Sequence, residues 1–214
     1  MATRKAPAGA LILLVRHGAT PTTGRVLPGR APGLHLSEDG ERQAERIAER
    51  VAALSPAALY TSPLERAVET AAPTAAATGL DPVEEPGLLE CDFGDWTGEA
   101  LSSVSRHTQW RSLMTAPASF RFPGGESLAE LEARVVTTLE RLRTAHAGQL
   151  VVCFSHADPI RAALTFALGA PLDSFHRINV GTGSISVIRF PSDAAPSVLA
   201  VNSLHGPLEL GTTG

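Results

Sequence analysis

The sequence predicts an α/β protein in which helices cover both faces of a mostly parallel sheet, a three-layer α/β/α sandwich. Short apolar runs, typical of strands buried on both faces, alternate along the chain with segments whose apolar residues recur at helical spacing. The length of 214 residues suits one domain with a sizeable core, and 43% hydrophobic with 19% charged residues is ordinary for a globular chain. We therefore expect one domain over residues 10–204, between flexible ends at residues 1–9 and 205–214.

The first predicted strand is the apolar run "ALILLVR" at residues 10–16. A loop rich in glycine and proline follows it. A helix is then expected to begin at Ser37, with Ala44, Ile47 and Val51 on one face. The run "ALYTS" is the second strand candidate.

The segment "SPLERAVETAA" after the second strand carries the start signals of a helix. Ser62 is placed to cap this helix, Pro63 stands at its first position, and Glu65 could complete a capping box. Arg66 would then lie in the first helical turn.

Residues 81–125 are rich in loop formers and end in the turn signal "FPGG", and their secondary structure stays unassigned. Ser127 and Glu130 form another capping box ahead of a long helix. The run "QLVVCFSH" is a third buried strand, and a helix follows from about Pro159. The segments "SISVIRF" and "SVLAVN" close the fold as strands.

Charge and cysteine content exclude several classes of protein. The formal net charge of -4 argues against general nucleic-acid binding, which rewards concentrated positive charge. Cys91 and Cys153 are too few and too far apart for a disulfide framework or a zinc site. No stretch is long and apolar enough to span a bilayer, and the first residues lack a cleavage signal. We expect a cytoplasmic protein with no metal and no membrane or nucleic-acid partner.

Two arginines and two histidines are expected at one edge of the sheet. Arg16 and His17 end the first strand, Arg66 lies early in the helix after the second, and His156 ends the third. Because ligands bind beyond the carboxyl ends of parallel strands, these side chains would gather around a compact anion, most obviously phosphate. Neutral imidazole is a good nucleophile toward phosphorus, and the positive groups would stabilise the phosphoryl group during transfer.

Five segments occur in an order that matches a known family: "RHG" after the first strand, then "SPLERAVETA", "LLECDFGDWTG", "PGGES" and "SHADPIRA". Over roughly residues 10–190 the chain resembles the histidine phosphatase superfamily, the phosphoglycerate-mutase-like group of branch 1. The resemblance implies a phosphoglycerate mutase-like fold and chemistry without metal or cofactor. Its partner would be a small phosphorylated metabolite.

The resemblance also implies roles for individual residues. His17 would be the nucleophile that becomes phosphohistidine, and Arg16, Arg66 and His156 would hold the phosphate. Glu90 would protonate the leaving alkoxide and then help water attack the phosphohistidine. His17 must then be neutral and Glu90 protonated, although their reference pKa values of about 6.5 and about 4.3 favour the opposite. We expect arginines to lower the first pKa, burial to raise the second, and activity to peak on the acidic side of neutrality.

Three positions depart from the family pattern. Thr23 stands where mutase-like members often have an asparagine near the phosphate, and Ala157 replaces the glycine of the usual Ser-His-Gly. Another branch uses an aspartate directly after the second histidine as its acid. Asp158 is one residue later and, followed by Pro159, is typical of a helix cap. Glu90 therefore stays the predicted acid, with Thr23 and Ala157 beside the phosphate.

Other nearby residues stay open as alternatives. Asp92, Asp95 and Glu99 lie close in sequence to the predicted acid and could serve in its place. Arg30 is a predicted substrate-binding residue. Together with Arg25 it could contact an anionic part of the substrate, although a surface loop is an equal alternative.

Hydrolysis of a small phosphomonoester is the favoured function. Mutases shield phosphohistidine with a lid inserted between the acid and the "GES" segment, whereas residues 92–122 are short here, and "FPGGES" is more similar to phosphatases. A phosphoglycerate-type mutase and a binding module without turnover stay open. A serine hydrolase is disfavoured, because the neighbours in "FSHAD" would seldom form a triad and no Gly-x-Ser-x-Gly is present. Strand edges near the carboxyl end could pair in a homodimer.

Overall fold

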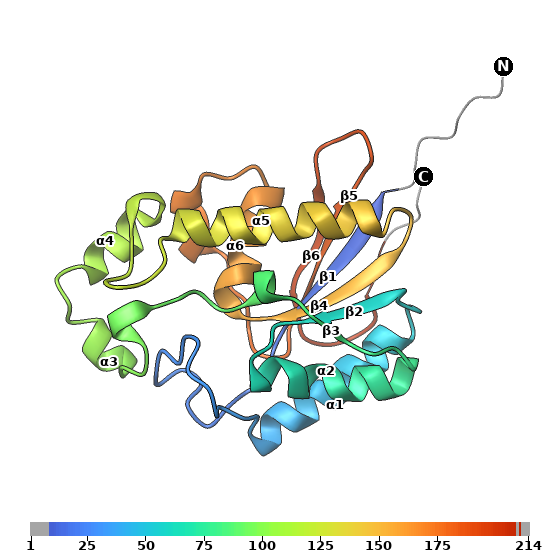
Figure 1. The fold of residues 1–214 in the computed structure, drawn as a ribbon, viewed down its shortest axis with the longest axis horizontal. Helices are drawn as coiled ribbons and strands as arrows, with labels where there is room; N and C mark the ends of the chain where they lie inside the picture. Colours follow the sequence, from blue (N-terminus) through green and yellow to red (C-terminus); the bar gives the residue numbers. More distant parts are fainter. Residues whose placement is uncertain (1–8, 209, 211–214) are drawn as a thin grey trace.

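The computed structural model describes residues 9–208 and 210, in which the strands form one sheet (Figure 1). The strands are β1 (Ala10–Arg16), β2 (Ala58–Thr61), β3 (Val83–Glu84), β4 (Leu150–Ser155), β5 (Ile185–Phe190) and β6 (Ser197–Ser203). Their order across the sheet is β3-β2-β4-β1-β5-β6. Strand β4 runs parallel to β1 and to β2, β3 is parallel to β2, and β5 and β6 are antiparallel to their neighbours. The prediction of a mostly parallel sheet is confirmed.

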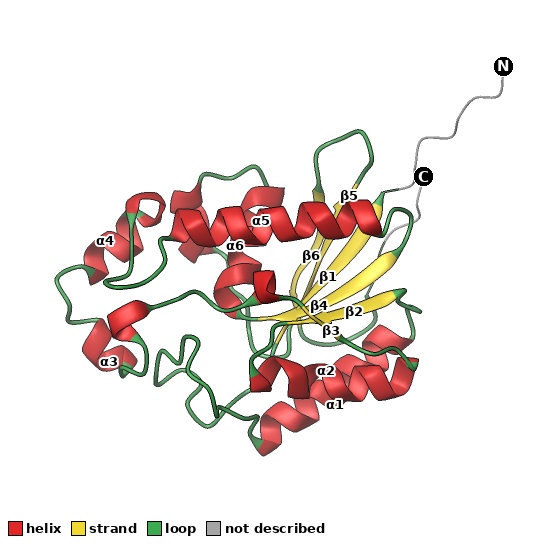
Figure 2. Ribbon diagram, viewed as in Figure 1, coloured by secondary structure: helices red, strands yellow, loops and turns green. Residues whose placement is uncertain are grey.

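Helices cover both faces of this sheet, which confirms the predicted three-layer sandwich (Figure 2). The α-helices are α1 (Glu38–Ala52), α2 (Glu65–Thr78), α3 (Leu101–Val104), α4 (Trp110–Thr115), α5 (Leu128–Ala145) and α6 (Ala157–Ala167). Helices α1 and α2 pack on one face and α5 and α6 on the other. Side chains of strand β1 belong to the hydrophobic cores on both faces of the sheet. Ile12 and Leu14 pack on the α5/α6 side, and Leu13 and Val15 pack on the α1/α2 side. This alternation explains why the strand reads as a continuous apolar run.

Two of the predicted helix starts are confirmed by their caps. The Ser37 hydroxyl accepts from the Gly40 amide at the start of α1, and Ser127 with Glu130 forms the complete capping box of α5. The predicted cap of α2 is wrong, because that helix begins at Glu65 with Leu64 as its N-cap and no side-chain cap. Ser62 is not used as a cap.

The start of α6 also differs from the sequence prediction. This helix begins at Ala157, with His156 as its N-cap residue, so Asp158 is the second helical residue rather than the cap. Pro159 follows inside the first turn. The Asp158 carboxylate instead accepts from Arg161, one turn further along, at 2.8 Å. Because Asp158 does not cap the helix, its side chain is available for contacts beside the carboxyl end of the sheet.

The unassigned middle of the chain forms short pieces beyond the carboxyl ends of the parallel strands. Helices α3 and α4 lie there, together with 3₁₀ turns at Pro86–Leu88, Gly94–Trp96 and Pro117–Ser119 (Figure 1). An isolated bridge between Val26 and Ala100 joins this region to the loop after β1. The loop after β1 and the middle of the chain thus lie side by side beyond the end of the sheet.

The two ends of the chain are only partly described. Most of the predicted flexible start at residues 1–9, and residues 209 and 211–214 of the predicted flexible tail, lie outside the described residues. Two residues in the described part of the tail contact the rest of the domain. Leu208 and Leu210 pack against the α1/α2 core, and Arg189 donates to the Leu210 carbonyl at 2.7 Å. This packing removes apolar surface of the two leucines from water, which favours the contact.

Two glycines allow the loop after β1 to approach helix α1 closely. A Cβ on Gly18 would stand 2.5 Å from the Gly40 carbonyl oxygen, and a Cβ on Gly40 would stand 2.1 Å from the Ala19 carbonyl oxygen. Such distances leave no room for a side chain at either position. This contact fixes the backbone that follows the end of β1.

Replacing Gly40 by alanine tests this contact. Helix propensity alone favours alanine by about 1 kcal/mol, whereas the clash with Ala19 should lower the free energy of unfolding by about 1–3 kcal/mol. Chemical denaturation would measure the change, with Glu49→Ala on the exposed face of α1 as control. A Gly40→Ala protein as stable as the parent would contradict the packing.

Candidate active site

The predicted arginines and histidines meet at the carboxyl edge of the parallel strands. Arg16 is the last residue of β1 and His17 follows it, His156 follows β4, and Arg66 is the second residue of α2. The rings of His17 and His156 lie 5.1 Å apart between centroids. The parallel directions of β1, β2 and β4 thus bring together residues that are far apart in sequence.

One hydrogen bond orients the His17 ring. Its Nδ1 lies 2.7 Å from the Gly18 carbonyl oxygen, which can only accept a proton. We therefore assign the neutral tautomer with the proton on Nδ1, which leaves the lone pair of Nε2 free. His17 lines a cavity of about 390 Å³.

The surroundings keep this imidazole uncharged. Burial lowers the pKa of His17 well below its ordinary value, and the positive charges of Arg16 and Arg66 lower it further. The bond to Gly18 opposes this shift but does not reverse it. His17 therefore has the properties of a nucleophile, since protonation would remove its free lone pair.

Several buried nitrogen atoms around His17 have no partner. Arg66 is fully buried and donates through Nη2 to the Gly29 carbonyl at 2.8 Å, and Arg16 donates through Nη1 to the Val180 carbonyl at 2.6 Å. Within the described part of the chain, Arg16 Nε, Arg66 Nε, Arg66 Nη1 and His156 Nδ1 make no hydrogen bond. Buried polar atoms are nearly always paired, so this cluster fits an oxygen-rich anion.

His156 is held by the serine that was expected to cap α2. Its Nε2 and the Ser62 hydroxyl are 2.7 Å apart, and both residues are fully buried. Burial lowers the pKa of His156 well below its usual range, and the neighbouring charges of Arg66 and Arg16 lower it further. The imidazole is therefore neutral, with Nδ1 unpartnered.

Glu90 lies at the same cavity and has the opposite pKa shift. It is 7% exposed, and burial followed by the charge of Asp158 raises its pKa to about 7. Its Oε1 accepts from the Cys91 amide at 3.0 Å. A carboxyl group with this pKa can carry a proton at neutral pH and release it above neutrality.

The alternative acids lie outside the cavity. Among its lining residues the carboxylates are Glu90 and Asp158. Asp92 accepts from the Gly94 amide at 3.0 Å, and Glu99 lies 3.1 Å from His107. The geometry favours Glu90 over these two residues and over Asp95, which is likewise not among the lining residues.

Arg30, a predicted substrate-binding residue, is engaged by other groups of the protein. It is not among the cavity-lining residues, and its Nε donates to the Glu90 carbonyl at 2.8 Å while its Nη2 pairs with Glu126 at 3.0 Å. Arg134 also pairs with Glu126 at 3.0 Å and donates to the Leu89 carbonyl at 3.0 Å. Arg30 and Arg134 therefore hold the backbone at Leu89 and Glu90. Arg25 is also absent from the lining.

Thr23 and Ala157 line the cavity. The Thr23 hydroxyl accepts from the Thr20 amide at 2.8 Å, which folds the loop after β1 back toward the nucleophile. Ala157 is the first residue of α6, so its amide belongs to a helix amino end, where anions are stabilised.

Sequence reasoning missed Arg161 and His176, which also line the cavity, and assigned Asp158 to a cap. The spacing of Asp158 and Arg161, three residues apart on a helix, was the available signal. His176 belongs to a 3₁₀ helix at Leu172–Arg177, and its Nε2 bonds to the Leu113 carbonyl at 3.1 Å. Only the tertiary structure brings His176 to the site.

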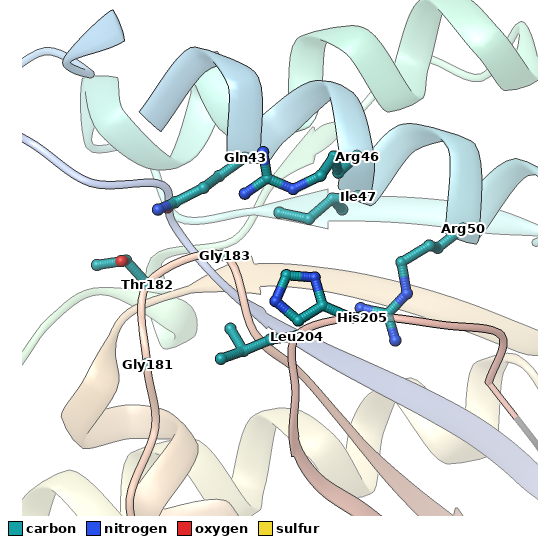
Figure 3. A pocket seen from close by; sticks show the side chains of 9 residues that line it. All are labelled: Gln43, Arg46, Ile47, Arg50, Gly181, Thr182, Gly183, Leu204 and His205. Carbon is teal, nitrogen blue, oxygen red and sulfur yellow. The ribbon is translucent and has the colours of Figure 1, made fainter. Parts of the chain in front are cut away.

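A second cavity of about 260 Å³ lies between α1 and the ends of β5 and β6 (Figure 3). Gln43, Arg46 and Arg50 face it from the helix, opposite Thr182 and His205. None of the predicted site residues lines it. The Arg50 guanidinium is engaged by carbonyls and a hydroxyl at the end of β6, at Ser203 and Gly206. The cavity at His17 is therefore the candidate active site.

Two further properties concern residues 9–208 and 210. No group of three or more His, Cys, Asp or Glu side chains there is arranged to hold a metal ion. No helix in the same part of the chain has the length and apolar character to cross a membrane.

The charge of Asp158 should control the proton on Glu90. Replacing Asp158 by asparagine removes a negative charge and frees Arg161, and both changes favour the carboxylate, so the pKa of Glu90 should fall below about 7. Titration of the Glu90 carboxyl carbon by ¹³C NMR would measure this, with the exposed Asp81→Asn as control. An unchanged midpoint would contradict the coupling.

Comparison with known proteins gives the chain a family. A family model described as histidine phosphatase superfamily (branch 1) matches residues 12–203. Phosphoserine phosphatase 1 of Hydrogenobacter thermophilus is 35% identical over 182 residues, covering 83% of this chain and 85% of that protein. A probable phosphoglycerate mutase GpmB of Yersinia enterocolitica is 32% identical and covers 84% of each chain.

Other relatives agree with this result. The bifunctional protein Rv2228c of Mycobacterium tuberculosis is 35% identical over 199 residues, which cover 89% of this chain but 53% of that protein, so the chain spans about half its length. The solved structure of mycobacterial glucosyl-3-phosphoglycerate phosphatase Rv2419c shares the fold, with a TM-score of 0.82 at 23% identity over 91% of this chain and 99% of that chain. With the ordered motifs, the sheet topology and the clustered histidines and arginines, these matches establish that the chain belongs to branch 1 of the histidine phosphatase superfamily.

Proposed function

We propose that this protein is a metal-independent phosphatase that hydrolyses a small phosphomonoester through a phosphohistidine on His17. One observation carries the proposal: a neutral imidazole with a free Nε2 stands beside buried nitrogen atoms of Arg16, Arg66 and His156 that have no partner in the described part of the chain. Such an arrangement suits an anion that is both bound and attacked.

In the first step the lone pair of His17 Nε2 attacks phosphorus, and the bond from phosphorus to the alcohol oxygen breaks. Glu90, protonated because of its pKa of about 7, gives its proton to the departing oxygen. The guanidinium groups of Arg16 and Arg66 stabilise the charge on the phosphoryl oxygens during transfer. The products are the free alcohol and phosphohistidine.

In the second step water attacks the phosphorus of phosphohistidine. The Glu90 carboxylate accepts a proton from this water, and the phosphorus–nitrogen bond breaks. Its electron pair returns to His17 Nε2, which regenerates the neutral ring. Inorganic phosphate leaves, and Glu90 is protonated again for the next cycle.

Hydrolysis is proposed in preference to phosphoglycerate-type mutation. The segment at residues 92–122 contains short elements only, α3, α4 and 3₁₀ turns, where a mutase needs a lid that keeps water from phosphohistidine. The phosphatase relative from Hydrogenobacter thermophilus is also more similar to this chain than the mutase relative from Yersinia enterocolitica. Both observations support water as the acceptor.

A cytoplasmic location and a homodimer belong to the same proposal. Cys91 and Cys153 are buried and unpaired, which suits a reducing compartment. Among the described strands β6 pairs with β5 alone, so a second copy could pair with its other edge. Analytical ultracentrifugation would test the dimer.

The covalent intermediate gives the direct test of the reaction. With chelator present, the parent protein should release phosphate from 2-phenylethyl phosphate. A labelled phosphoryl group transferred from the substrate to the protein should be lost after acid quenching and retained after alkaline quenching, because a phosphoramidate is labile in acid and stable in alkali. His17→Ala should abolish both turnover and labelling. Turnover that persists in His17→Ala would contradict the proposal, and an inert parent that still binds phosphate would favour a binding module.

The role of Glu90 can be separated from binding in the same assay. Glu90→Gln should slow release of an alkyl alcohol by about 10²–10⁴-fold. It should slow release of 4-nitrophenol much less, because that leaving group departs without a proton. Equal losses with both substrates would indicate that Glu90 does not protonate the leaving oxygen.

A further inference from the structure

The cavity at His17 extends well beyond the phosphate-binding groups. Its volume of about 390 Å³ falls within the range of small-molecule ligand sites, about 300–1,000 Å³. Arg16, His17 and Glu90 are among its lining residues. The lining also includes residues of the loop after β1, Phe93, and residues of α3, of α4 and of the segment that leads into α5. The remaining space is therefore available to the leaving group.

The part of this lining that we call the apolar end is aliphatic and aromatic, whereas Thr20, Thr22 and Thr23 of the loop after β1 add polar groups beside it. The apolar end includes Leu27, Phe93, Trp110, Leu113, Met114 and Phe122. Phe93 and Phe122 are buried with ring centroids 4.9 Å apart, whereas Trp110 is half-buried and Met114 is 42% exposed. Aromatic and sulfur-containing side chains of this kind pack favourably against a ring.

The charged residues of the cavity are already paired or used. The lining cations are Arg16, which belongs to the phosphate end, and Arg161. Arg161 donates to Asp158 at 2.8 Å and to the Ile178 carbonyl at 3.1 Å. Burial lowers the pKa of His176, which favours its neutral form. Apart from Arg16, which serves the phosphate, a carboxylate on the leaving group would therefore meet among the described lining residues only Arg161, which is already ion-paired with Asp158.

We propose that the substrate is a phosphomonoester whose leaving group is uncharged and carries an aromatic ring, and that the cavity disfavours esters with a carboxylate. This inference rests on the proposed function for its chemistry, but its binding preference stands on the lining of the cavity. The ring occupies the space between Trp110, Met114 and Phe122, while the phosphate lies at Arg16 and His17. Removal of apolar ring surface from water supplies the affinity.

Phosphonates test the preference without turnover, because their carbon–phosphorus bond resists hydrolysis. Calorimetry would compare 3-phenylpropylphosphonate with 3-carboxypropylphosphonate, and propylphosphonate would serve as the common reference. We expect the phenyl compound to bind about tenfold tighter than the reference, or better, and the carboxylate compound no tighter than the reference. Equal binding of the two substituted compounds, or tighter binding of the carboxylate, would overturn the proposal.

A cation added at the cavity rim should reverse the preference. Met114→Arg places a guanidinium beside the apolar end, so 3-carboxypropylphosphonate should bind about tenfold tighter and the phenyl compound more weakly. Val83→Arg, on an exposed position of the edge strand β3, is the matched control and should change neither affinity. The same response in both variants would overturn the placement of the ring.

Turnover of the matching esters distinguishes failure of this inference from failure of the proposed function. Hydrolysis of 2-phenylethyl phosphate and 2-carboxyethyl phosphate at equal kcat/KM would overturn the ring preference and leave the phosphatase intact. Tight binding of the phenyl phosphonate with no hydrolysis of either ester would overturn the proposed phosphatase activity and leave the ring preference intact. The two primary alcohols leave with similar ease, so the comparison reports recognition rather than leaving-group reactivity.

Discussion

The site depends on positive charge placed beside uncharged imidazole in the protein interior. Arg66 is fully buried, the Nε of Arg16 is buried, and each guanidinium has a backbone carbonyl as one partner. Within the described residues, Arg16 Nε, Arg66 Nε and Arg66 Nη1 have no partner. Each buried unsatisfied group costs about 1–3 kcal/mol. That cost is recovered when an anion binds, and meanwhile the same charges keep His17 neutral. One arrangement therefore serves both binding and nucleophilicity.

Glu90 is tuned by the opposite means. Its surroundings combine burial with the negative charge of Asp158, and together these outweigh the nearby arginines and raise its pKa to about 7. The arginines that hold its backbone, Arg30 and Arg134, are in turn paired with Glu126. The backbone of the acid is therefore held by arginines whose ion pairs lie outside the cavity lining, while Asp158, which lines the cavity, raises the pKa of its carboxyl group.

Much of the fold was predictable from sequence because local signals and tertiary structure agree. The apolar run before Arg16 is buried on both faces, and the caps at Ser37 and Ser127 act within their own helices. The gathering of His17 and His156 followed from the rule for parallel strands alone. Ordered motifs then pointed to the family.

The long-range contacts that sequence reasoning did not predict have a common physical cause. Ser62 has the local pattern of a cap but is bound to His156, which is 94 residues away. Arg30 has the look of a free loop cation, but Glu126 and the Glu90 carbonyl engage it across the fold. His176 carries no local signal, because only the packing of the chain beyond α6 brings it to the cavity. Long-range partners of this kind leave no trace in sequence spacing.

The charge and tautomer of His17 test the account most directly. ¹⁵N NMR of protein labelled at histidine, in phosphate-free buffer and with His17→Ala for assignment, reports both ring nitrogens. The account predicts the neutral Nδ1-protonated form with a free Nε2 from about pH 8 down to below about pH 6, where an ordinary histidine is largely charged. An imidazolium at pH 6, or a proton on Nε2 of the neutral ring, would contradict it.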